Sequence, residues 1–206
     1  MLELNETIKK HFRNPQNVGE LENPEGEGAI TNESIIEKTS LRKSPLSPLC
    51  QRGVIPPFSK GREGGIYLQC PYNYGLINNN PVCGDTTKLY LRIKNGVVED
   101  AKFLSFGCAV TIASASVFTE KIKGKEISNL FLGTEDEVIQ RLMSLIESEL
   151  GEIPPIKLHC PPATVQVFLD AVRGYLEKEG RIDLSSKAKS LIPKISEYYK
   201  RGNEKE

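Results

Sequence analysis

An alternating stretch followed by Asn-Gly constrains the fold of this 206-residue chain more than any other feature. Apolar or β-branched residues at every second position are separated by charged residues and one tyrosine, and Asn95-Gly96 follows directly. A period of two is typical of a strand with one buried face, and Asn-Gly favours a two-residue type I′ hairpin turn. The return strand, 97–106, places Ala101 and Phe103 on one face. The alternating positions of the first strand are Thr87, Leu89, Leu91 and Ile93.

Four other segments carry apolar residues at helical spacing. The first covers Leu2 to Phe12 and stops at Asn14-Pro15, because proline disfavours helical backbone in the residue before it. The others are expected from Cys108 to Lys123, from a Thr134 cap to Glu149, and from Pro161 to Glu179. The predicted buried faces are Val138, Leu142, Leu145 and Ile146, and then Val165, Phe168, Leu169, Val172 and Leu176. This set predicts an α+β fold in which several helices pack on one face of a small antiparallel sheet of about three strands.

The stretch from about residue 30 to 79 has a different character, with scattered prolines and glycines and no clear periodicity. Such a stretch buries little and is long for a loop, so we predict a disordered insertion. It would interrupt a single domain, 1–180, which a helical or flexible tail, 181–206, follows. Residues 17–28 are expected to form turns at the surface, and Ile66–Gln69 is a weak strand candidate within the insertion.

Charge and composition exclude several classes of function. Lys+Arg and Asp+Glu both number 27, so the chain lacks the net positive charge that binding to nucleic acid favours. No apolar stretch approaches the roughly 20 residues that span a bilayer, and the first residues do not form a signal sequence. We therefore expect a cytoplasmic protein. Its five cysteines are then expected to serve metal or sulfur chemistry rather than disulfides.

Three of the cysteines lie at predicted junctions between elements: Cys83, Cys108 and Cys160. Cys160 precedes a proline, so we expect it to be extended and to cap the following helix, and Cys108 begins the earlier helix. A helix N-terminus favours the thiolate, which binds zinc and iron–sulfur clusters in four-coordinate sites. Three thiolates leave one position, which Asp85 could fill through oxygen or His159 through nitrogen.

Other interpretations of these residues remain open. The same ligands would support a structural zinc module, and a thiol hydrolase would use Cys160 or Cys108 with His159 and Asp85. Cys50 and Cys70 lie in the predicted insertion and are not expected to be ligands. His11 is expected to be a surface or packing residue.

Four segments together resemble one family, and they occur in that family's order. They are Asn14-Pro-Gln-Asn-Val-Gly19, Asn80-Pro-Val-Cys-Gly-Asp85, Asp100 to Cys108 followed by Ile112-Ala-Ser-Ala-Ser116, and Ile153-Pro-Pro-Ile-Lys-Leu-His-Cys160. In these segments the chain closely resembles the NifU/IscU-type iron–sulfur scaffold proteins, over residues 2–29 and 80–178. In the family, the region of the predicted insertion normally forms the first strand of the sheet, and Ile66–Gln69 would be its replacement.

The resemblance implies a function and a set of site residues. Cys83, Cys108 and Cys160 match the family cysteines, Asp85 the aspartate linked to cluster lability, and His159 the family histidine. Cys160 would accept persulfide sulfur from a cysteine desulfurase. The chain would catalyse no turnover but would build a [2Fe-2S] cluster, or a [4Fe-4S] cluster on a homodimer, and give it to apo-proteins.

The same resemblance implies further ligands and partners. Zinc would occupy the same ligands in the apo-like state. Ferredoxin and a frataxin-like protein are implied as further partners. Ile153-Pro-Pro-Ile-Lys157 resembles the segment that an Hsp70-type chaperone binds in some members.

Overall fold

The computed structural model describes residues 4–30 and 85–203, with side chains at 4–29 and 85–195. Cys50, Cys70, Cys83 and the strand candidate Ile66–Gln69 lie outside these residues. The predicted disordered insertion, and with it the interrupted domain 1–180, therefore stays a prediction. No helix in the described stretches combines the length and the apolar character needed to cross a membrane.

The sheet confirms the predicted small antiparallel architecture. Its described strands are β1 (Gly26–Ile30), β2 (Thr86–Lys94) and β3 (Val97–Phe106), and each neighbouring pair is antiparallel in the order β1-β2-β3. Asn95 and Gly96 connect β2 to β3 with φ angles of 52° and 78°. Both angles are positive, as a type I′ turn requires, so this hairpin is confirmed.

Strand β1 corrects one prediction. Residues 17–28 were expected to form surface turns, yet Gly26, Glu27 and Gly28 pair with β2. Glycine has low strand propensity, so the pattern gave no strand signal here. The glycine is needed for packing, because a Cβ on Gly28 would lie 2.2 Å from the Val167 carbonyl oxygen. Helix packing, not local propensity, selects glycine at this position.

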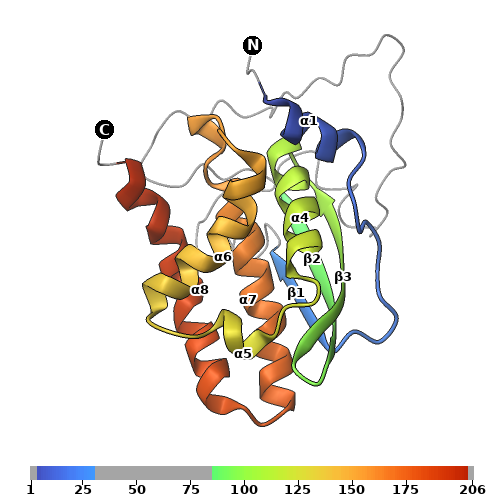
Figure 1. Cartoon of the computed structure of the whole chain (residues 1–206), viewed down its shortest axis with the longest axis vertical. Coiled ribbons are helices and arrows are strands. Elements are labelled where there is room, and N and C mark those ends of the chain that lie inside the picture. Colours follow the sequence, from blue (N-terminus) through green and yellow to red (C-terminus); the bar gives the residue numbers. More distant parts are fainter. Residues whose placement is uncertain (1–3, 31–84, 204–206) are drawn as a thin grey trace, which may run out of the picture.

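The helices lie against one face of the sheet (Figure 1). Helix α4 packs on β3, α7 packs on β1 and β2, and α6 packs on both helices. This arrangement confirms the α+β fold. The described helices are α1 (Glu6–Arg13), α4 (Ala109–Ile122), α5 (Ile127–Leu130), α6 (Glu135–Leu150), the 3₁₀ turn η1 (Pro155–Lys157), α7 (Cys160–Lys178) and α8 (Ile182–Asn203).

Capping side chains set where two of the helices begin. Helix α1 begins at Glu6, later than the predicted Leu2, because the Asn5 side chain accepts a hydrogen bond from the Ile8 N–H. Helix α6 begins after Thr134, as predicted, and Thr134 and Glu137 form a reciprocal capping box.

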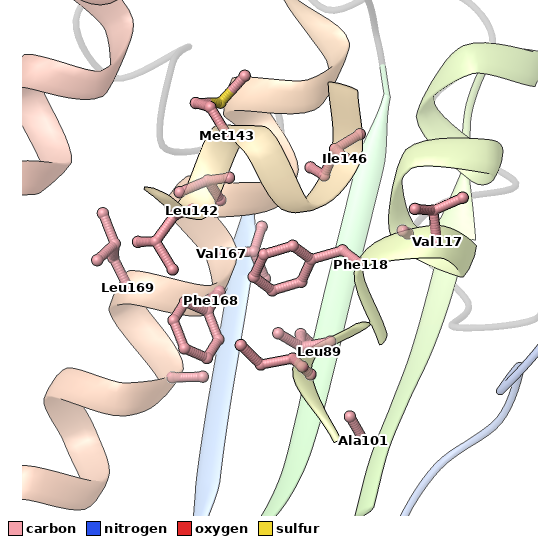
Figure 2. Close-up of a cluster of buried hydrophobic side chains, with 14 of the residues drawn as sticks. Leu89, Ala101, Val117, Phe118, Leu142, Met143, Ile146, Val167, Phe168 and Leu169 are labelled. Atoms are coloured by element: carbon pink, nitrogen blue, oxygen red, sulfur yellow. The ribbon is translucent and has the colours of Figure 1, made fainter. Parts of the chain in front are cut away.

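The core lies between the sheet and helices α4, α6 and α7, where side chains from all four meet (Figure 2). The rings of Phe118 and Phe168 contact edge to face, with centroids 5.1 Å apart. On α6 the predicted stripe is wider than expected, since Ile139 and Met143 are also buried while Leu145 is only partly buried. The physical reason is that α6 contacts α4 on one side and α7 and α8 on another.

Helix α8 packs along α7 and includes most of the predicted tail. Ala188, Leu191 and Ile195 are fully buried. Pro193 lies inside the helix and does not end it. Of the two alternatives for the tail, 181–206, the helical one therefore holds from Ile182 to Asn203.

Candidate metal centre

Two strand ends and two helix N-termini bring three predicted ligands together. Thr86 pairs with Phe106 at the open end of the hairpin, so Asp85, just before β2, lies beside the residue that follows β3. Cys108 is the N-cap of α4, and Cys160 is the first residue of α7. The donor atoms of Asp85, Cys108 and Cys160 all lie within 4.8 Å of one another.

The spacing of the donors fits metal binding. The Sγ atoms of Cys108 and Cys160 are 3.6 Å apart. Two thiolates bound at 2.3 Å to one tetrahedral metal would have sulfurs about 3.8 Å apart. A set of two sulfurs and one carboxylate suits soft or borderline metals and leaves a fourth position for another ligand.

The carboxylate of Asp85 is held in place from three sides. The Thr111 hydroxyl donates to its Oδ2 at 2.5 Å, and the Cys108 N–H donates to the same oxygen at 3.4 Å. A Cβ on Gly107 would lie 2.7 Å from the Asp85 Cγ, so only glycine leaves room for this side chain. The aspartate is therefore positioned by the start of α4.

The two thiols have opposite protonation preferences. The pKa of Cys108 is lowered to about 6, first because the Cys160 thiol donates a hydrogen bond to it, against the effect of burial and of Asp85. The pKa of Cys160 is raised well above its usual value by that same hydrogen bond and by burial. Cys160 is 1% exposed, whereas Cys108 is partly exposed. These opposite directions favour the thiolate on Cys108 and the proton on Cys160 in the metal-free site.

His159 contacts Cys160, one member of this group. Its Nε2 lies 3.6 Å from the Sγ of Cys160, and it is not part of the three-residue donor group found in the described chain. Its pKa is lowered, first by burial and then by the charge of Lys157. The neutral imidazole that results is the form that binds metals.

The start of α7 corrects another prediction. Cys160 was expected to be extended and to act as the N-cap, but His159 is the N-cap, with φ −74° and ψ −14°, and Cys160 is helical. The reason is that η1 leads almost directly into α7, so the chain is already coiled before Pro161. Cys160 still lies at a helix N-terminus, and the bent backbone brings the adjacent imidazole and thiol into contact.

The remaining candidate residues have mixed outcomes. Cys83 lies outside the described residues, so its place in the ligand set stays a prediction. His11 is confirmed as a packing residue, because it is 6% exposed and its Nδ1 lies 2.9 Å from the Ser116 hydroxyl. Thr111 is a site residue that sequence reasoning missed. Its position three residues after Cys108 on a helix, which places both on one face, was the available signal.

Comparisons with known proteins agree with the chemistry of this site. The sequence model of the family described as "NifU-like N terminal domain" matches residues 54–182, more than half of the chain. The iron-sulfur cluster assembly scaffold protein IscU 1 of Archaeoglobus fulgidus is 36% identical over 125 residues, which are 57% of this chain and 76% of that protein. The iron-sulfur cluster assembly scaffold protein IscU of Aquifex aeolicus is 29% identical over 187 residues, with 90% of this chain and 83% of that protein covered.

One solved structure is similar at a lower level. The crystal structure of a nitrogen-fixing NifU-like protein (N-terminal) from Brucella abortus shares 15% identity and aligns with a TM-score of 0.46. The alignment covers 84% of this chain and 94% of that one. At this TM-score and identity, the structural similarity adds nothing to the sequence match.

Proposed function

The chain belongs to the NifU-like N-terminal domain family, and from this premise we propose that it is a scaffold for building transient iron–sulfur clusters and giving them to apo-proteins. The main support is that the donor atoms of Asp85, Cys108 and Cys160 lie within 4.8 Å of one another. Relatives named as assembly scaffolds favour this role over the alternative of a structural zinc module. The scaffold is a carrier and not an enzyme.

We propose that Cys83 completes the ligand set. It precedes Asp85 by two residues, and two residues of chain span no more than about 7 Å, a length that would allow its thiol to reach the described donors. His159 is a competitor for the position of Asp85, because it contacts Cys160 and its pKa favours the neutral form. A carboxylate is a weaker ligand than a thiolate for a soft centre, which suits a cluster that must leave.

Sulfur delivery would use Cys160. Cys160 would first pass its proton to the Cys108 sulfur, 3.6 Å away. The Cys160 thiolate would then attack the terminal sulfur of a persulfide on a cysteine desulfurase, the donor S–S bond would break, and the donor cysteine would leave as a thiolate. A ferredoxin-class donor would supply the electrons that reduce this sulfur to sulfide. Because Cys160 is 1% exposed, the surrounding side chains must move before the donor reaches it.

Exposure supports one further partner. In the segment Ile153-Pro-Pro-Ile-Lys157, the Ile156 side chain is 60% exposed, as a residue gripped by an Hsp70-type chaperone would be. Four expectations stay predictions. They are a frataxin-like partner, a homodimer that holds [4Fe-4S] in place of [2Fe-2S], zinc in the apo-like state, and a cytoplasmic location.

A thiol hydrolase is disfavoured by the same geometry. A hydrolase nucleophile must be an accessible thiolate in every catalytic turnover, which needs lasting exposure and a lowered pKa. Cys160, which contacts His159, is buried and has a raised pKa. The thiol with the lowered pKa, Cys108, instead contacts Cys160 and Thr111.

Anaerobic reconstitution tests the scaffold function. The full chain is incubated with ferrous iron, cysteine and a cysteine desulfurase, and the cluster chromophore is followed before and after addition of apo-ferredoxin. We expect a coloured protein whose cluster moves to the ferredoxin, while Cys108→Ala forms none. The proposal would be refuted if the chain stayed colourless and all its thiols still reacted with an alkylating reagent after the incubation. Tightly bound zinc that iron and sulfide do not displace would support the zinc module.

A further inference from the structure

We propose that Thr111 is a positioning residue that holds Asp85 as a ligand through a single oxygen. The proposal rests on the scaffold function for its meaning, but the contacts that carry it belong to the metal-free chain. Thr111 is 2% exposed and lies one helical turn after Cys108 on α4.

The Thr111 hydroxyl contacts two members of the donor group. It donates to Asp85 Oδ2 at 2.5 Å and lies 3.4 Å from the Sγ of Cys108. One uncharged side chain thus touches two of the three ligands that the described structure brings together.

A hydroxyl has one hydrogen, and this limits what Thr111 can do. When that hydrogen is given to Asp85, it is not available to the sulfur of Cys108. The carboxylate is the group that gains a donor, and a donor of this kind orients a metal ligand. Because Thr111 is buried, water cannot readily replace the hydroxyl if it is removed.

The contacts also select which oxygen is left for the metal. Within the described part of the chain, the hydrogen bonds from Thr111 and from the Cys108 N–H both end on Oδ2. We infer that Oδ1, which receives neither of these hydrogen bonds, is the oxygen that would bind the ion. A carboxylate held in this way binds through one oxygen, so a competing ligand has only one metal–oxygen bond to displace.

Zinc affinity of the apo-chain tests this role without any cluster chemistry. The probe is zinc alone, titrated into the metal-free full chain in competition with a chromophoric chelator. We expect Thr111→Val to weaken zinc binding by about 10-fold or more, the usual cost of removing a partner that orients a ligand. Thr111→Ser, which keeps the hydroxyl, should restore most of the affinity.

A double-mutant cycle shows whether the effect passes through Asp85. In an Asp85→Ala background, Thr111→Val should cause no further loss. Ser114→Ala is the matched control, because Ser114 is also buried on α4 but its hydroxyl has no hydrogen-bond partner among the residues that the structure describes. That control should bind zinc like the unaltered chain.

Two results would overturn the proposal: unchanged zinc affinity in Thr111→Val, or the same loss with and without Asp85. Its failure can be told apart from failure of the scaffold function. If the unaltered chain transfers clusters but shows no coupling between positions 111 and 85, only the positioning role is wrong. If the coupling is present and no cluster forms, only the scaffold function is wrong.

Discussion

The sulfur atoms of Cys108 and Cys160 lie 3.6 Å apart, although the two residues are separated by 52 positions in the sequence. Each cysteine stands at the N-terminal end of a long helix, and α4 and α7 pack against each other. The positive ends of two helix dipoles therefore face one site, which favours negative charge on the bound sulfurs. The pairing also makes the two thiols unequal, and this inequality can be measured.

Cys108 should react with iodoacetamide before Cys160 in the apo-chain. With its pKa lowered to about 6, Cys108 is mostly thiolate at pH 7.5, and its rate should fall as the pH drops through 6. Cys160 keeps its proton and is buried, so we expect a rate at least about 10-fold lower. Peptide mass spectrometry over a time course reads each site separately. In urea the two rates should converge, and faster labelling of Cys160 in the folded chain would contradict the geometry.

Replacement of Gly107 by alanine should weaken metal binding without touching a ligand. The new Cβ would lie 2.7 Å from the Asp85 Cγ, so the carboxylate must move away from the thiols. We expect zinc affinity to fall by about 10-fold, comparable to the loss of an orienting partner. Gly174→Ala is the control, since a Cβ there meets no atom within 4 Å. Equal affinities in the two variants would show that Asp85 does not bind zinc.

Gly28→Ala should destabilise the fold through the contact of β1 with α7. Its Cβ would lie 2.2 Å from the Val167 carbonyl oxygen and 2.7 Å from the Ala171 nitrogen. Backbone cannot move aside cheaply, so we expect a loss of about 1–3 kcal/mol in the free energy of unfolding, from urea titration followed by circular dichroism. Gly174→Ala, in an open helical position, should instead gain about 0.5–1 kcal/mol. A neutral Gly28→Ala would mean that β1 does not pack on α7.

Leu191→Ala tests whether α8 is part of the folded unit. Leu191 is fully buried, and its truncation should cost about 2–5 kcal/mol in the free energy of unfolding. Lys189→Ala, on the exposed side of the same helix, should change it by less than about 0.5 kcal/mol. If both variants unfold alike, the tail contributes nothing to the domain.

Local patterns were sufficient for most of the fold. The alternation before Asn95-Gly96 specifies the hairpin, and the Thr134 cap specifies where α6 begins, because both depend on contacts within a few residues. Strand β1 could not be found this way. Gly28 is selected by the backbone of α7, which lies about 140 positions further along the chain, and local propensity carries no trace of such a contact.

The site, like the fold, could be predicted only in part from the sequence. A metal centre was indicated by the residue types of Asp85, Cys108 and Cys160 and by their positions at the ends of helices and strands. The resemblance to one family indicated that its chemistry is iron–sulfur cluster assembly. Neither revealed that Thr111 connects the carboxylate to the Cys108 thiol. A threonine inside a helix has many structural uses, and only its distance to Asp85 distinguishes this one.

The pairing of Ile30 with Thr87 has a consequence for the order of folding. Strands β2 and β3 are joined by a two-residue turn, and hairpins of that kind form in about 1–10 μs. Strand β1 must instead find β2 across the whole stretch 31–86, which carries a larger entropy of loop closure. The hairpin can therefore nucleate the sheet before β1 joins it. Shortening that stretch should speed folding while leaving the rate of unfolding almost unchanged.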